Sequence, residues 1–370
     1  MPAPSAAPSP QIPFSIWWLA RALVRHPGWF VRLGNLESSL FQEQLDPIVI
    51  DRPIFICGLA RSGTTITLEL LTSLDGVVSH RYQDFPCVHL PLAWNRALGG
   101  DARKTAAPVE RLHGDGIYVT SASPEAIEEP LWMSFFPQAH DPRVSNLLPA
   151  TLDRPEFARF YRRNLQKILM LRGGRRIAVK GNYLLSRLPY LARLFPDARF
   201  IVLVREPLEH VASLARQQRI FAEAQRTNAR AQDYLRALGH FEFGLDRRPI
   251  NMGDDAVIEE ILARWARGEE LAGSALYWRH LYGSLSALLA EDEDLARRVA
   301  IVRFETLYGE PAQTLRRLLD HCGLDADAPP LESLAARLKP PRLYRPDIPA
   351  GEAADVARIC APVASLYGYA

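Results

Sequence analysis

The 370-residue sequence is poor in cysteine. Its four cysteines are widely spaced, at Cys57, Cys87, Cys322 and Cys360. No two of them form a CxxC pair, so the sequence has the pattern of neither a disulfide scaffold nor a zinc site. A chain of this kind is typical of a reducing compartment, so we expect a cytoplasmic protein without a metal.

The sequence also lacks an excess of basic residues. It has 44 Lys and Arg against 42 Asp and Glu, a formal net charge of +2. A protein that coats nucleic acid would carry a clear basic excess, so we expect no nucleic-acid partner. Hydrophobic residues make up 48% of the chain, which predicts a globular protein with a real core. A local basic pocket for a small anion is compatible with this balance.

No apolar run is long enough to cross a membrane. A Pro/Ala/Ser-rich tail, residues 1–12, is expected to be disordered. The aromatic stretch that follows, residues 14–30, is interrupted by Arg21, Arg25 and Pro27 before the ~20 residues of a span are reached. It also lacks the pattern of a signal peptide. Two interpretations stay open: an amphipathic helix that covers the core, or a helix that contacts a membrane surface peripherally.

Strand-like and helix-like segments alternate along most of the chain. Short buried strands are expected at 54–57, 175–182, 198–207 and 298–307, and helices at 14–45, from 64 onward, and at 157–172, 184–195, 208–219 and 311–324. This alternation predicts an α/β fold with a P-loop-like central parallel β-sheet flanked by helices. We expect one domain over 46–345, with a largely helical insertion on the acceptor side at 220–290. Residues 1–45 are expected to be a tail with N-terminal helices, and 346–370 a C-terminal tail.

A glycine-rich loop follows the first expected strand. Residues 58–65, GLARSGTT, have the glycine spacing of a Walker A loop, but Thr64 replaces the lysine. A nucleotide triphosphatase needs that lysine to reach the β- and γ-phosphates. The N–H groups at the helix start, with the hydroxyls of Ser62, Thr64 and Thr65, suit one phosphate. Arg61 can then hold a group attached to it, such as a sulfuryl group.

A second anion-binding segment is expected after the strand at 198–207. Arg205 closes this buried strand, and Ser213 lies eight residues later in the next helix. Open parallel sheets bind ligands beyond the carboxyl ends of their strands, so both side chains can converge on one anion. The fork of donors on an arginine suits a phosphate.

Together these segments resemble the sulfotransferase family that uses 3′-phosphoadenosine 5′-phosphosulfate (PAPS). The resemblance rests on GLARSGTT, on FPDARFIVLVREP with its later serine, and on VRFETLYGEPAQTLRRLLDHCGL. It is closest to the bacterial branch with R-S-G-T-T and spans about residues 52–325. It implies a 5′-phosphosulfate loop and a pair of 3′-phosphate contacts, which fall on Arg61, Ser62, Gly63, Thr64 and Thr65 and on Arg205 and Ser213, respectively.

The sequence departs from the cytosolic members of that family at the catalytic position. Those enzymes end the second strand with a lysine and place a catalytic histidine two residues later. The lysine matches Lys180, but the histidine position is Asn182. Their adenine-stacking tryptophan is also absent, with Ile66 in its place. Arg61 and Lys180 are the residues expected to stabilise charge on the leaving phosphate.

The proton acceptor has two kinds of candidate. Glu128 and Glu129 are adjacent in SPEAIEEPLW, and related sulfotransferases use a carboxylate base. Adjacent carboxylates in a cleft can raise one another's pKa, although glutamates also favour ordinary helix starts. His80 is the other candidate, or else a packing histidine. We prefer a glutamate.

The favoured function is transfer of a sulfuryl group from PAPS to a hydroxyl, less readily an amine, of a small-molecule, carbohydrate or lipid acceptor. One rival is a P-loop kinase, which Thr64 and the absence of an acidic Walker B strand end disfavour. Magnesium dependence separates the two, since sulfuryl transfer needs no metal. The other rival is a non-enzymatic nucleotide-binding or membrane-surface protein. The acceptor and the oligomeric state stay open.

Overall fold

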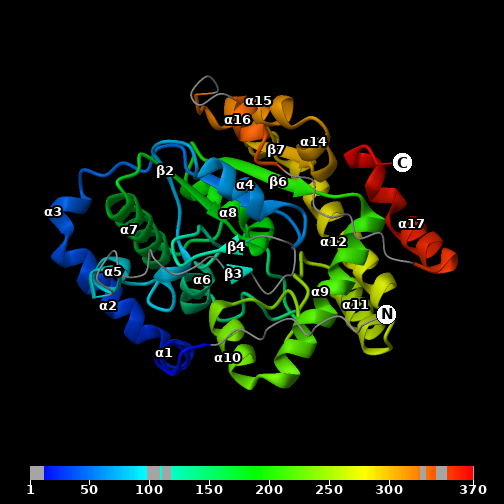
Figure 1. Cartoon of the computed structure of the whole chain (residues 1–370), viewed down its shortest axis with the longest axis horizontal. Coiled ribbons are helices and arrows are strands. Elements are labelled where there is room, and N and C mark those ends of the chain that lie inside the picture. The colour runs from blue at the N-terminus through cyan, green and yellow to red at the C-terminus, as the bar shows by residue number, and fades with distance from the viewer. Residues whose placement is uncertain (1–11, 98–108, 111–117, 326–330, 339–347, 370) are drawn as a thin grey trace.

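The computed structural model describes residues 12–97, 109–110, 118–325, 331–338 and 348–369. Its centre is a five-stranded parallel sheet in the order β2-β5-β1-β6-β7. The strands are β1 (Ile54–Cys57), β2 (Val77–Val78), β5 (Arg176–Lys180), β6 (Arg199–Val204) and β7 (Val299–Arg303). The predicted α/β fold with a parallel central sheet is therefore confirmed (Figure 1). A separate ribbon pairs β3 (Val109–Glu110) with β4 (Tyr118–Val119).

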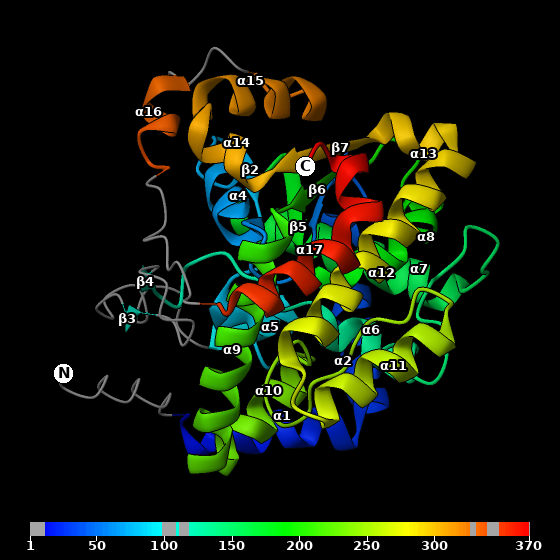
Figure 2. The same ribbon diagram turned by 90° about the vertical axis from the view of Figure 1, so that its right-hand side faces the viewer.

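Both faces of the sheet are covered by helices, because successive strand residues point to opposite sides. Ile54 and Ile56 of β1 belong to one apolar cluster, and Phe55 and Cys57 to another. The first cluster is completed by α4 (Thr64–Leu71), α15 (Pro311–Cys322) and α16 (Leu331–Ala335). The second is completed chiefly by α7 (Pro155–Arg172), α8 (Leu188–Leu194), α9 (Pro207–Thr227) and α12 (Glu270–Glu291). Figure 2 shows these two layers on either side of the sheet.

The predicted helices and strands agree with the observed ones where the sequence has a strong local pattern. Helix α15 ends at Gly323, whose φ of 59° lies in the left-handed region that glycine tolerates. The strand expected at 298–307 ends earlier, and α14 (Phe304–Gly309) follows it directly. Strand β2 was missed because its two residues are too short to show a period.

The N-terminal region forms the helices α1 (Phe14–Arg25), α2 (Pro27–Leu40) and α3 (Gln42–Leu45). Helix α1 packs on α10 (Ala229–Leu238), and the indole Nε1 of Trp17 donates to Asp233 Oδ2 at 3.1 Å. The predicted N-terminal tail lies mostly outside the described residues.

The C-terminal segment is not a tail, so this prediction is wrong. Residues Ala350–Ala364 form α17, which packs against α12 and α9 (Figure 2). Val356, Ile359 and Cys360 lie on one helical face and are buried in the core. In the sequence, a proline-rich stretch precedes this helix and favours a tail over an ordered element.

The insertion is largely helical, as expected. It contains the end of α9, then α10, α11 (Asp255–Ala266) and α12. However, Trp278 and Tyr282 of α12 are fully buried against the sheet layer. Helix α12 is thus part of the core, whereas the end of α10 and the loop after it line a pocket beside Lys180.

Candidate functional site

The glycine loop joins β1 to the start of α4, as predicted. Gly58 has a φ of 150°, and a Cβ there would meet the carbonyl oxygen of Leu203 at 2.5 Å. Gly63 has a φ of 101° and directly precedes α4. Arg61 has a φ of 75°, although it is not a glycine. Such a conformation persists only where the surroundings enforce it, and it concentrates at functional sites.

The loop carries an unsatisfied buried donor. Ser62 is fully buried, and its Oγ has no hydrogen-bond partner among the described residues. Thr64 and Thr65 of the first turn of α4 are also buried. A buried hydroxyl without a partner is costly, and here it lies beside the N-terminus of a helix. This arrangement fits a bound anion.

Two buried side chains from other elements hold the loop in place. The hydroxyl of Tyr282 on α12 accepts from Leu59 N at 3.3 Å and donates to Leu203 O at 2.8 Å. The ring of His210 on α9 contacts Ala60 O at 2.8 Å. Burial lowers the pKa of His210 to about 3, so the ring is neutral and its Nε2–H donates to that carbonyl.

The second predicted segment, which contains Arg205 and Ser213, also has an unsatisfied hydrogen-bond donor. Arg205 follows β6, and its guanidinium lies 4.5 Å from the ring centre of Phe304 and 3.2 Å from Glu209. Its Nε is buried and has no hydrogen-bond partner among the described residues. Glu206 caps α9 by accepting from two backbone N–H groups, which fixes the chain next to this arginine.

The two segments meet in space. Arg61 Nε donates to Ser213 Oγ at 3.4 Å, across 152 positions of sequence. The glycine loop and the first turns of α9 therefore face a common volume beyond the carboxyl ends of β1 and β6. This is the edge of a parallel sheet at which such folds bind ligands.

Lys180 closes β5 at the same edge and is paired. Its Nζ lies 2.6 Å from Glu125 Oε1, and both side chains are buried. Tyr82, from η1 (Tyr82–Asp84), donates to Glu125 Oε2 at 2.7 Å. Sequence reasoning missed Glu125, although it lies in the same SPEAIEE segment as the two predicted carboxylates.

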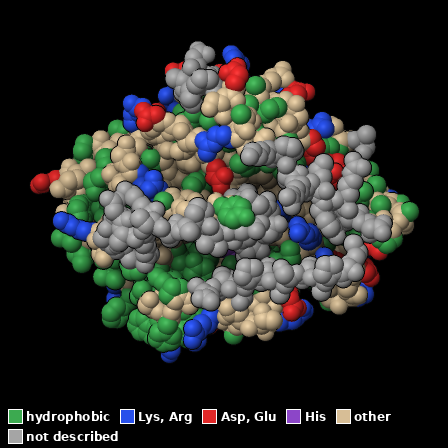
Figure 3. Space-filling model, viewed as in Figure 1, with side chains coloured by type: hydrophobic (Ala, Val, Ile, Leu, Met, Phe, Trp, Pro, Cys, Tyr) green, Lys and Arg blue, Asp and Glu red, His purple; other side chains and the backbone are tan. Residues whose placement is uncertain are grey.

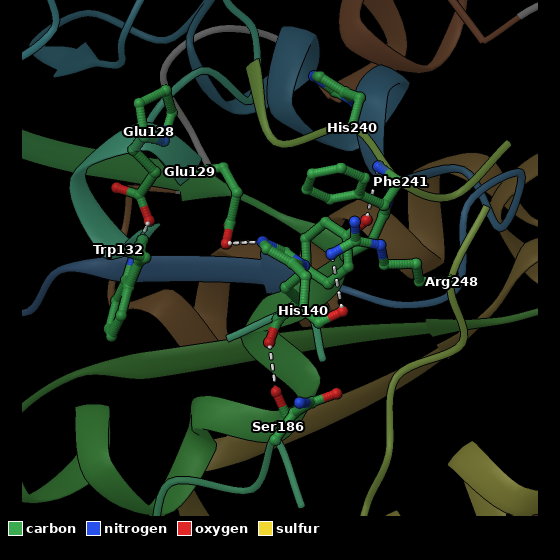
Figure 4. A network of polar contacts seen from close by, with 12 residues as sticks. Glu128, Glu129, Trp132, His140, Ser186, His240, Phe241 and Arg248 are labelled. Carbon is green, nitrogen blue, oxygen red and sulfur yellow. Dashed lines mark hydrogen bonds and ion pairs between the residues drawn. The ribbon is translucent and has the colours of Figure 1, made fainter. Parts of the chain in front are cut away.

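The predicted carboxylates lie side by side at the start of α6 (Glu129–Phe135) but have different surroundings. Glu128 accepts from Trp132 Nε1 at 3.0 Å (Figure 4). It also accepts from Tyr161 OH at 2.8 Å. Burial raises the pKa of Glu128 to about 7. This carboxyl group thus changes its protonation near neutral pH.

Glu129 is instead an anchor for two cationic or polar partners. Its Oε2 accepts from Arg187 Nη1 at 2.9 Å. Its Oε1 lies 2.7 Å from His140 Nε2 (Figure 4). Burial opposes ionisation, but the charges of Arg187 and His140 outweigh it and lower the pKa of Glu129 to about 2. Glu129 is therefore ionised throughout the physiological range.

His80 is buried next to Glu125. Its backbone carbonyl accepts from Glu125 N at 3.2 Å, and its ring is buried with Asp84 Oδ2 4.0 Å away. Neither ring nitrogen has a hydrogen-bond partner among the described residues. Burial lowers the pKa of His80 to about 4, so the ring is neutral near pH 7.

A narrow pocket opens beside Lys180. Its lining combines both predicted carboxylates with residues that follow β5 and α10, namely Glu128, Glu129, Lys180, Gly181, Asn182, Gly239, His240 and Glu242. Sequence reasoning missed His240 and Glu242, because they belong to a stretch in which only helices were recognised. The Arg205 and Ser213 pair does not line this pocket.

Within the described ranges, no three His, Cys, Asp or Glu side chains are grouped as metal ligands would be. The helices that the structure describes include none that is both long and apolar enough to cross a bilayer.

Comparison with known proteins shows the family. A model described as the sulfotransferase family matches residues 53–248, more than half of the chain. The fold is similar to that of the sulfotransferase STF1 from Mycobacterium tuberculosis H37Rv, with 16% identity, a TM-score of 0.51, and coverage of 89% of this chain and 81% of that one. It is also similar to STF9 from Mycobacterium avium, with 15% identity, a TM-score of 0.52, and coverage of 90% and 82%. No curated protein sequence matches. The chain belongs to the sulfotransferase family.

Proposed function

We propose that the protein transfers the sulfuryl group of PAPS to a hydroxyl group, less readily an amine, of an acceptor molecule. The observation that carries this proposal is the contact between Arg61 Nε and Ser213 Oγ. It joins a loop suited to one phosphate with helix α9, where Ser213, together with Arg205 at the end of β6, is suited to another. PAPS carries two separate anionic groups, a 5′-phosphosulfate and a 3′-phosphate, which such a divided site can bind.

The unsatisfied donors of the site fit this ligand. The 5′-phosphate would be held by Ser62 Oγ and by the N–H groups at Gly63, Thr64 and Thr65, where the helix dipole also favours an anion. The 3′-phosphate would be held by Arg205, whose Nε lacks a partner among the described residues, and by Ser213. Ser62 Oγ and Arg205 Nε, which are buried, would each gain a hydrogen-bond partner.

In the proposed sulfuryl transfer, the protein forms no covalent bond to the substrate. An acceptor oxygen attacks sulfur in line, the bond between sulfur and the 5′-phosphate oxygen breaks, and adenosine 3′,5′-bisphosphate leaves. Negative charge grows on the leaving phosphate, and Arg61 and Lys180 would stabilise it. The pairing of Lys180 with Glu125 keeps the ammonium fixed at the end of β5.

Among the three proton acceptors that the sequence offers, Glu128 has the most suitable protonation equilibrium. It lines the pocket, and its pKa of about 7 suits a base near neutrality. Glu129 is tied to Arg187 and His140, and in this proposal it positions the start of α6. His80 is neutral, but it lies behind the Glu125 backbone and does not line the pocket.

A donor-exchange assay tests the function. The protein is incubated with ³⁵S-labelled PAPS, excess EDTA and a panel of phenolic, sugar and sterol alcohols, and both labelled product and adenosine 3′,5′-bisphosphate are measured. We expect bisphosphate to form without metal, and Arg61→Ala to abolish its formation. Hydrolysis of ATP in magnesium, with no use of PAPS, would favour the kinase alternative instead.

We also propose that the N-terminal helices bind an anionic membrane surface. Trp29, Leu33, Leu36 and Leu40 are all exposed and recur at helical spacing along α2. On α1, Trp18 is 59% exposed. Figure 3 shows hydrophobic side chains gathered over this region with basic side chains at their edge.

The charges of α1 and α2 point to a lipid surface as the partner. Arg21, Arg25 and Arg32 are exposed, whereas Glu37 is the single acidic residue of these helices and is buried against Lys167 at 3.0 Å. Tryptophan with arginine is the composition of interfacial helices. A phosphatidylglycerol vesicle should therefore bind the protein more tightly than a phosphatidylcholine vesicle.

Cosedimentation with the two kinds of vesicle tests this surface. Changing Trp18 and Trp29 together to Ser should weaken binding to phosphatidylglycerol by about tenfold or more, because both side chains lose their insertion into the interface. Equal binding by the double variant would contradict the proposal. Self-association that the same substitutions abolish, without vesicle binding, would identify a second copy of the chain as the partner instead.

A further inference from the structure

The loop after α10 brings a histidine and a glutamate to the pocket beside Lys180. His240 Nδ1 lies 3.4 Å from Glu242 Oε2, and Asn182 Nδ2 donates to Glu242 Oε1 at 2.8 Å. The three residues thus form a chain of contacts from the end of β5 to the imidazole. All three line the same pocket as Lys180.

This loop is held firmly against the pocket wall. Gly239 ends α10 with a φ of 76°, and a Cβ there would lie 2.4 Å from Glu129 Cγ. The next residue but one, Phe241, donates its N–H to Tyr183 OH at 2.9 Å. These contacts fix the backbone on both sides of His240, so its ring has a defined place at the pocket.

We propose that His240 takes the proton from the acceptor and that Glu242 orients its ring for this role. This inference rests on the proposed sulfuryl transfer. The position two residues after Lys180 is occupied by Asn182, an amide that cannot act as a base at neutral pH. Asn182 instead binds the carboxylate that contacts the histidine. The imidazole therefore reaches the pocket from the helical insertion and not from the strand end.

Glu128 is less open to an acceptor than His240 is. Both of its oxygens accept hydrogen bonds from the core side chains Tyr161 and Trp132, and it is 3% exposed. His240 is partly exposed, and its Nε2 has no hydrogen-bond partner among the described residues. With Nδ1–H directed at Glu242, the lone pair of Nε2 is available to the pocket.

The proton and electron pairs balance in the proposed step. The acceptor O–H gives its proton to His240 Nε2 while its oxygen forms the new bond to sulfur. The electron pair of the broken bond stays on the leaving 5′-phosphate. Glu242 stabilises the resulting imidazolium, and the proton later returns to solvent.

The charges around the imidazole support this role. Burial alone would lower the pKa of His240, but Glu242 raises it above its usual value of 6.5 overall. Glu125 adds to this increase, and Lys180 opposes it. Glu128, Glu129 and Tyr183 are the other titratable groups on the pocket wall. A histidine in this setting is a stronger base than a free imidazole.

The test uses water as the probe acceptor, so that no natural acceptor is needed. Release of ³⁵S-labelled sulfate from saturating PAPS is measured across about pH 5 to 9, and affinity for adenosine 3′,5′-bisphosphate is measured by calorimetry. His240→Gln should slow sulfate release by about 100-fold while changing bisphosphate affinity by less than about threefold. Glu242→Gln should move the acid limb of the pH profile to lower pH.

His26→Gln is the matched control, since His26 is an exposed histidine between α1 and α2 and should leave both quantities unchanged. Glu128→Gln is measured in parallel. If His240→Gln keeps the wild-type rate, or if only Glu128→Gln removes the acid limb, the assignment of His240 is overturned while the proposed function stands. If the wild-type protein neither binds the bisphosphate nor releases sulfate, the proposed function fails and the assignment of His240 fails with it.

Discussion

Arg61 Nε donates a hydrogen bond to Ser213 Oγ at 3.4 Å, which links the loop after β1 to the helix after β6. Neither residue packs in the apolar core, and the backbone of Arg61 has a left-handed conformation. Such a conformation costs free energy, of order 1–3 kcal/mol, that the fold must supply. The contact thus brings two distant segments to one place, as the proposed binding of one nucleotide requires.

Removing either partner should weaken binding of adenosine 3′,5′-bisphosphate. Ser213→Ala deletes one neutral hydrogen bond, worth about 1 kcal/mol, and should weaken affinity about fivefold. Arg61→Ala deletes a charge-assisted contact and should weaken it by about 100-fold. Because the two side chains touch, the double variant should lose less affinity than the sum of the single losses in calorimetry. Strict additivity would show that they serve separate ligands.

Arg205 should discriminate between nucleotides by their 3′-phosphate. Arg205→Met keeps the packing against Phe304 but removes the guanidinium, so bisphosphate affinity should fall by about 2–3 kcal/mol. Affinity for adenosine 5′-monophosphate should change little. Arg205→Lys should recover only part of the loss, because an ammonium lacks the fork of donors. Equal losses for both nucleotides would place Arg205 elsewhere on the ligand.

Glu128 should make stability depend on pH. Burial raises its pKa from 4.5 to about 7, so the folded state binds this proton more tightly than the unfolded state does. The resulting stabilisation is fully present below pH 4.5 and is lost as the pH rises through 7. Denaturant unfolding should therefore show that wild-type protein loses about 1–3 kcal/mol more than Glu128→Gln does between pH 5 and 8. Glu129, with its pKa of about 2, titrates outside this window. Parallel pH profiles for the two proteins would contradict this account of Glu128.

The buried hydroxyl of Tyr282 should matter for both folding and ligand binding. Tyr282→Phe leaves Leu59 N and Leu203 O unpaired, which should cost about 1–3 kcal/mol of unfolding free energy and weaken bisphosphate binding. Tyr367→Phe is the control, because Tyr367 OH donates to Tyr282 O, away from the loop. The control should lose stability in denaturant unfolding without losing affinity. Unchanged affinity in Tyr282→Phe would show that the glycine loop does not need this support.

The parts of the fold that sequence could predict are those with a local pattern. Strands β1 and β6 are short apolar runs that end in a glycine or an arginine, and helix α7 has a clear helical period. The glycine loop and the Arg205 segment are similarly local, so their positions at the sheet edge followed from the parallel topology alone. The direct contact between Arg61 and Ser213 could not be predicted from the sequence and is seen only in the structure.

The other parts of the fold and of the site depend on tertiary contacts, which produce no local pattern in the sequence. Glu125 pairs with Lys180 across 55 positions, and His240 reaches the pocket only because Gly239 turns the chain at the end of α10. The apolar face of α17 is buried by packing on α12. The sequence predicted α12 to be part of an acceptor-side insertion, so this packing could not be predicted. Such pairings are set by packing between elements, where local propensity is a weak guide.

Calorimetric titration of the wild-type protein with adenosine 3′,5′-bisphosphate in EDTA tests the central claim most directly. We predict one site per chain with a micromolar or tighter dissociation constant, which is lost when Arg61 and Arg205 are both replaced by Ala. Absence of binding heat at several temperatures, or undiminished binding by the double variant, would contradict the claim that these two arginines hold one nucleotide.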